Sequence, residues 1–241
     1  MADTTLIKGA RASRSTIALK LLMAGSGLIF IGFVLTHMYG NLKAFGGRES
    51  FNEYAHHLRV FGEPKLPENG LLWVIRIVLL VSLIVHVASA AALAKRNVRA
   101  RSQKYAVKKN KASSLSSRTM RWGGVTLLVF IVWPLINSTI GKVTPTPNPT
   151  PAGGPDGTGD PYLLMVDTFD VWWMTIIYLL AMLALGLHLH HGTWSAMQTL
   201  GLTNTARSRA GSKTAGWIVA VVIAGGFSLV PLAVLAGVIT K

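Results

Sequence analysis

The sequence predicts an all-α, polytopic membrane protein, with five transmembrane helices in a bundle and a short interfacial helix outside the bilayer. Two observations predict this class: 51% of the residues are hydrophobic and come in long blocks, and only 14% are charged. Soluble domains carry about 25% charged residues, and a helix needs about 20 mainly apolar residues to cross a bilayer. We therefore expect one membrane domain, with spans at residues 16–38, 71–93, 123–140, 171–191 and 215–238.

Residues at the ends of the blocks are typical of a membrane interface. Lys20 lies near the start of the first span, where its amine can reach the headgroups, and Trp73 opens the second. Trp122 precedes the third span, and Trp172 and Trp173 open the fourth. The segment before residue 16 is polar and basic, and no small-residue cleavage site follows the first block, so this block is expected to remain as a helix.

The connecting segments predict the orientation. Residues 94–121 form a loop rich in Lys and Arg without any acid, and basic residues also precede the first and fifth spans. The other two connections, residues 39–70 and 141–170, are balanced or acidic. Because cytoplasmic loops are enriched in Lys and Arg, we expect the N-terminus in the cytoplasm and the C-terminus outside. The expected location is a bacterial cytoplasmic membrane.

The two outer segments differ in pattern. In residues 39–70, one helical stripe predicts the short interfacial helix; it comprises Phe51, Tyr54, His57, Leu58 and Phe61. Residues 141–170 are predicted to be an outer loop, because the stretch 144–161 is rich in Pro and Gly.

Composition also excludes several functions. The net charge of +15 lies mostly between apolar blocks, which favours lipid headgroups over nucleic acid as the partner. The chain has no cysteine, so it cannot hold an iron–sulfur cluster through thiolates or attach a c-type haem. Histidine remains as the natural transition-metal ligand, and there are seven.

His86 and His188 form the best-matched pair of histidines. Each lies several residues before the inner end of a span that runs from outside to inside, so both are at a similar depth. A haem standing between two helices needs one imidazole on each side at a common depth. His191 lies one turn from His188 and is the alternative ligand, or a partner for a haem propionate, whereas His190 points away from both.

The remaining candidates lie near the outer side. His37 is near the outer end of the first span, too far from His86 to share its haem, and His57 or His56 is its alternative partner. Arg76 lies inside the outer end of the second span, where it can form an ion pair with an anionic group or extend to the headgroups.

Together these residues resemble the cytochrome b membrane anchor of succinate:quinone oxidoreductases (succinate dehydrogenase, complex II), in its single-chain, five-helix form. The resemblance covers nearly the whole chain. It rests on the order of four pieces: HMYGN at 37–41, FNEYAHH at 51–57, the histidine of the second span, and HxxxGxWS at 188–195.

The resemblance implies a subunit that docks a flavoprotein and an iron–sulfur protein on the cytoplasmic face, and passes electrons through haem b to a quinone such as menaquinone. It assigns one haem to His86 and His188. A second haem would use His37 and a histidine of the third or fourth span. The third span has FIVWPLIN and no histidine, so a partner chain is another source of this ligand. One haem is therefore expected, and two remain the alternative. Tyr39, Asn41 and Lys43 are candidates for a quinone site, and the complex could form a higher oligomer.

Two other functions compete with this one. Intramembrane histidines could relay protons or metal ions in a transporter, although no span carries Asp or Glu and no inverted repeat is visible. The chain could also be a structural anchor without haem. In either case it lacks a soluble catalytic domain, so any enzyme activity would belong to an assembled complex.

Overall fold

The computed structural model describes residues 15–100, 114–140 and 159–241. Within these ranges the chain is helical and contains no strand. The elements are α1 (Thr16–Leu42), η2 (Lys43–Gly46), α2 (Gly47–Val60), α3 (Gly70–Arg99), α4 (Leu115–Pro134), η3 (Leu135–Ile140), α5 (Pro161–Asp170), α6 (Trp172–Thr199) and α7 (Ala206–Leu235).

Five of these helices, α1, α3, α4, α6 and α7, are long and apolar enough to cross a membrane. The predicted fold class of a multi-pass helical membrane protein is thus confirmed. The helices extend beyond the predicted spans: α3 continues to Arg99, α4 begins at Leu115 and α7 at Ala206. Hydropathy marks only the part inside the bilayer, whereas polar turns continue each helix to a capping residue such as Ser114 or Thr205.

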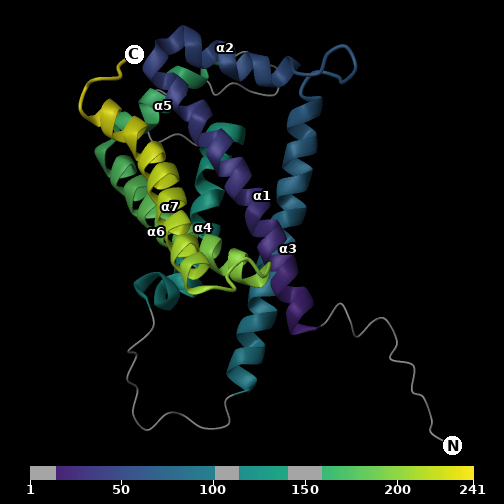
Figure 1. Ribbon diagram of the computed structural model, residues 1–241. Helices are drawn as coiled ribbons and strands as arrows, with labels where there is room; N and C mark the ends of the chain where they lie inside the picture. The colour runs from purple at the N-terminus through teal and green to yellow at the C-terminus, as the bar shows by residue number, and fades with distance from the viewer. Residues whose placement is uncertain (1–14, 101–113, 141–158) are drawn as a thin grey trace, which may run out of the picture.

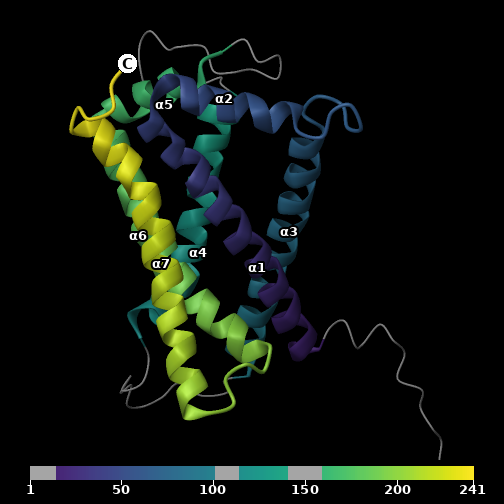
Figure 2. The ribbon, with the colours of Figure 1, turned by 45° about the horizontal axis from the view of Figure 1, so that its top comes forward.

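The spans pack unevenly around α6 (Figures 1 and 2). α6 packs along α7 and α4, and α1 contacts α3, α6 and α7. Small residues allow the closest approaches: a Cβ atom at Gly216 would come within 2.6 Å of the His190 carbonyl oxygen, and one at Gly226 would overlap Met38. The side chains of Trp73, Ile77, Leu80 and Ile84 on α3 are more than half exposed, as expected for a surface that faces lipid.

α2 and α5 lie across the end of the bundle where α7 finishes (Figures 1 and 2). The interfacial helix predicted from the sequence is present as α2, although it ends before Phe61. α5 was not predicted, because its sequence falls in the segment 141–170 that we expected to be a loop; residues 141–158 are outside the described ranges. Asp160 caps α5 and Pro161 takes its first position, both of which favour helix initiation.

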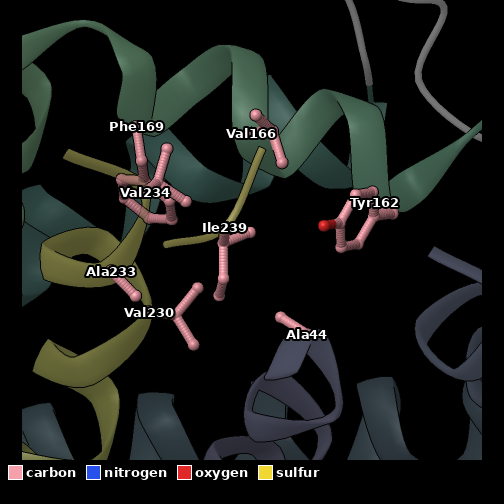
Figure 3. Close-up of a cluster of buried hydrophobic side chains, with 8 residues drawn as sticks. All are labelled: Ala44, Tyr162, Val166, Phe169, Val230, Ala233, Val234 and Ile239. Atoms are coloured by element: carbon pink, nitrogen blue, oxygen red, sulfur yellow. The ribbon is translucent and has the colours of Figure 1, made fainter. Parts of the chain in front are cut away.

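α5 covers the end of the bundle where α7 finishes, with a compact apolar cluster (Figure 3). Tyr162, Val166 and Phe169 of α5 pack on Ala44 and on residues in the last turns of α7 and just after it, namely Val230, Ala233, Val234 and Ile239. The Tyr162 hydroxyl donates a hydrogen bond to the Thr240 carbonyl oxygen at 2.9 Å. We refer to α2, α5 and residues 236–241 together as the outer cap, and use 'outer' and 'inner' as labels for the two ends of the bundle, after the orientation expected from the sequence.

Polar contacts connect the parts of the outer cap to one another. Arg48 forms an ion pair with Asp160, and the Asn52 amide donates to the same carboxylate at 2.9 Å. Burial acts to raise the pKa of Asp160, but hydrogen bonds from the Leu163 backbone N–H, Asn52 and Arg48, with the Arg48 charge, together lower it. Nζ of Lys241 forms an ion pair with the Asp167 carboxylate at 2.6 Å. The hydrogen bond and the charge of this carboxylate raise the pKa of Lys241.

Candidate functional site

The structure brings the rings of His86 and His188 together. His86 comes from α3 and His188 from α6, two helices that are not close-packed neighbours, and the ring centroids lie 6.2 Å apart with 52° between the planes. The two rings therefore lie at a similar depth, as their positions in the two spans predict. An imidazole nitrogen binds a metal at about 2 Å, which puts its ring centroid roughly 3 Å from the metal, so two rings on opposite sides of one ion have centroids about 6 Å apart.

Glycines from two further helices face these rings. A Cβ atom at Gly27 of α1 would lie 3.5 Å from Cε1 of His86, and one at Gly124 of α4 would lie 3.5 Å from Cε1 of His188. Each histidine is thus flanked by a position that has no side chain. The site is built by four helices, with α3 and α6 providing imidazoles and α1 and α4 providing space.

The two histidines differ in their hydrogen bonding. Nδ1 of His86 lies 3.1 Å from the Ser26 hydroxyl of α1, and the Phe30 ring meets the His86 ring edge-on at 5.9 Å. Nδ1 of His188 is buried without a hydrogen-bond partner. Buried polar atoms without a partner are rare in proteins, so this atom marks a place where a ligand or a water fits.

A cavity of about 170 Å³ adjoins His188 on the side of α4. Its wall is otherwise mostly apolar; the lining residues are Thr119, Met120, Gly123, Leu180, Leu183, Ala184, Leu187 and His188. The cavity is smaller than the roughly 300–1,000 Å³ typical of small-molecule and cofactor sites. The facing imidazoles, rather than this cavity, are what favours a cofactor at this place.

The other two histidines of α6 point elsewhere. His190 is 8% exposed, its Nδ1 lies 2.9 Å from the Ser116 hydroxyl, and its ring packs on Trp217 of α7 with centroids 4.3 Å apart. It therefore joins α4, α6 and α7. His191 meets Trp194 edge-on, and its Nδ1 is buried without a partner. Of the alternatives in α6, His188 is the one whose ring faces α3.

The outer histidines are not brought together. The His37 ring stacks on Phe33 at 5.3 Å and lies 5.6 Å from the Phe227 ring of α7, so it faces α7. His56 and His57 are exposed on α2, where the His57 ring contacts Phe61. All seven histidines lie within the described ranges, and His86 with His188 is the one pair whose rings meet across two spans.

The remaining predicted site residues lie at the outer surface. Lys43 sits over the Tyr39 ring at 5.1 Å, and the Asn41 amide donates to the His37 carbonyl oxygen at 2.8 Å. Arg76 is exposed and sits over Trp73 at 5.0 Å. This placement matches an arginine that extends to the headgroups, and it keeps Arg76 apart from His86 and His188.

Sequence reasoning missed Ser26, Gly27 and Gly124. Glycine and serine are common in membrane helices, so no local signal separates these three from others nearby. In the described part of the chain, no group of three or more His, Cys, Asp or Glu side chains could hold a metal ion, and a haem needs only two axial ligands. Comparison with protein-family models, curated proteins and solved structures found no match.

Proposed function

We propose that this chain is the haem b-carrying membrane anchor of a succinate:quinone oxidoreductase, which passes electrons from an iron–sulfur partner to a quinone. The observation that supports the proposal most is the meeting of His86 and His188 between α3 and α6. The sequence resemblance suggests the particular complex, and the five apolar helices agree with an anchor.

In this proposal, His86 and His188 would hold the haem iron, and Gly27 and Gly124 would leave space beside them. Haem b, when bound between two imidazoles, supplies a one-electron carrier inside the membrane. Apolar side chains adjoin both imidazoles: Phe30 meets the His86 ring, and Leu187 lines the cavity beside His188.

The inner end of the bundle would face the partner subunits. Basic side chains gather where α3 ends and where α4 and α7 begin; among the described residues they include Lys95, Arg96, Arg118, Arg121, Arg207 and Arg209. We assign one haem to the chain, because the ring of His37 faces α7 and not a second imidazole. A quinone, preferably menaquinone, would be the electron acceptor.

The test is the haem content of the chain purified with its partner subunits. We expect one b-type haem per chain by pyridine haemochrome, and loss of that haem in His86→Ala and in His188→Ala. His56→Ala is the matched control, since His56 is exposed on α2 and should leave the haem in place. Full haem retention in both ligand variants would refute the assignment, and a colourless wild-type protein that moves protons in liposomes would support a transporter instead.

A further inference from the structure

We propose that Ser26 is a positioning residue for His86: it accepts a hydrogen bond from Nδ1–H and so leaves Nε2 as the atom that binds iron. The inference rests on the proposed haem site and adds to it a residue from a helix that supplies no ligand. Ser26 lies on α1, is 5% exposed, and has its Oγ 3.1 Å from His86 Nδ1.

The direction of this hydrogen bond follows from the other contacts of the hydroxyl group. A serine hydroxyl has one proton to donate. The Leu22 carbonyl oxygen lies 2.8 Å from Ser26 Oγ, and the Met23 carbonyl oxygen lies 3.2 Å away. Both are acceptors only, and the Leu22 carbonyl oxygen is the nearest partner for the one proton of Ser26. With the proton directed there, the Ser26 oxygen offers a lone pair to His86, and we assign Nδ1 as the donor.

The tautomer that results is the one that ligation needs. A neutral imidazole protonated on Nδ1 carries its free lone pair on Nε2. Histidines that bind metals generally donate their other N–H to an acceptor in the protein, which fixes the ring and makes the ligating nitrogen more basic. His86 has this acceptor, whereas Nδ1 of His188 has none. The two proposed ligands therefore differ: the orientation of His86 is fixed by its hydrogen bond to Ser26 of α1, whereas His188 has no such bond.

This role makes predictions that a simple packing contact does not. A more basic Nε2 stabilises ferric over ferrous iron, so loss of the hydrogen bond should raise the midpoint potential of the haem. Loss of the hydrogen-bond partner of a metal-binding histidine typically weakens metal binding about 10–100-fold. If binding of the ferric form weakens tenfold more than that of the ferrous form, the potential rises by about 59 mV for this one-electron couple.

The experiment compares Ser26→Ala and Ser26→Cys with the wild type in the assembled complex, by redox titration of the haem and by the rate of haem loss to an apo-acceptor protein. We expect faster haem loss and a higher potential in Ser26→Ala. Ser26→Cys should shift both in the same direction but less, because sulfur is a weak acceptor of similar size. If Ser26→Ala does not assemble, the Cys variant still tests the proposal.

Ser212→Ala is the matched control. Ser212 is 1% exposed on α7, and its hydroxyl donates to the Arg209 carbonyl oxygen of its own helix at 2.9 Å, so it should change neither readout. A wild-type potential and haem-loss rate in both Ser26 variants would overturn the role of Ser26 while leaving the haem proposal intact. If the wild-type complex holds no haem, the proposed function itself fails.

Discussion

The inner and outer halves of this bundle differ in whether their polar groups have hydrogen-bond partners within the chain. In the outer half, Asp160 is paired with Arg48 and Asn52, and Tyr162 with the Thr240 carbonyl. In the inner half, α6 carries most of the buried polar atoms of the described residues that have no hydrogen-bond partner; they belong to His188, His190, His191, Thr193 and Trp194. Polar groups at the outer end are thus paired within the chain, whereas several buried polar atoms of α6 at the inner end have no hydrogen-bond partner among the described residues.

The same contrast applies to the histidines. His86 and His188 face each other where α1 and α4 present glycine, so the inner half has two facing imidazoles beside positions that lack a side chain. His37 in the outer half is packed between aromatic rings, and Met38 beside it fills the gap left by Gly226. His37 meets only aromatic rings, whereas the two inner imidazoles meet each other, which agrees with the one-haem form of our proposal.

The largest effect should come from filling the space beside the inner histidines. Gly27→Leu and Gly124→Leu place a side chain against the rings of His86 and His188, since a Cβ atom alone already lies 3.5 Å from each. Overpacking typically costs about 1–3 kcal/mol, which corresponds to roughly five- to 150-fold weaker haem binding. The measurement is haem content and haem-loss rate of the purified complex.

Gly25→Leu provides the matched control for these variants. Gly25 lies on the same helix as Gly27, but a Cβ atom there has no neighbour within 4 Å. The Gly25→Leu variant should therefore retain its haem. Equal haem loss in Gly25→Leu and Gly27→Leu would show that leucine disturbs α1 in general rather than the site.

A smaller and separate effect should follow from loosening the outer cap. Asp160→Ala removes the N-cap of α5 together with the bonds to Arg48 and Asn52. Loss of an N-cap costs about 1 kcal/mol, so amide exchange in α5 should become roughly fivefold faster. Asp160→Asn should have the smaller effect, because asparagine keeps an oxygen for the cap but loses the charge.

The same carboxylate gives the outer cap a pH dependence with a defined sign. The pKa of Asp160 is lowered in the folded chain, so its contribution is fully present above the ordinary aspartate pKa and is lost as pH falls through the lowered value. The protection factors of the α5 amides, which are corrected for the intrinsic pH dependence of exchange, should therefore fall in acid, and this fall should vanish in Asp160→Ala. Haem content should not change in either variant, since the outer cap and the inner pair are independent.

The smallest effect is expected from His37→Ala. If the chain binds one haem between His86 and His188, removal of the outer imidazole leaves the haem content, the spectrum and the potential unchanged. The pyridine haemochrome assay and a redox titration check this. Loss of half of the haem would instead show that His37 ligates a second haem, and the contrast between the two halves would have to be abandoned.

Sequence patterns predicted much of this fold because they report local properties. Hydropathy located all five spans, and the apolar stripe from Phe51 to Leu58 located α2. The turn-rich stretch before Pro161 obscured α5, whose apolar residues are buried only because α7 and η2 lie against them. Of the candidate site, counting along the two spans placed His86 and His188 at one depth, as the structure has them.

The sequence by itself thus determined that the chain crosses a membrane five times and carries histidines at matched depth, because span length and axial position depend only on consecutive residues. The tertiary structure decided which way each helix is turned about its axis. The spans are apolar nearly all round, so no stripe of polar residues sets that rotation; contacts such as Gly216 against His190 and Gly226 against Met38 set it instead. That rotation turns His188 toward His86, His37 toward α7, and Ser26 toward the imidazole that we propose it positions.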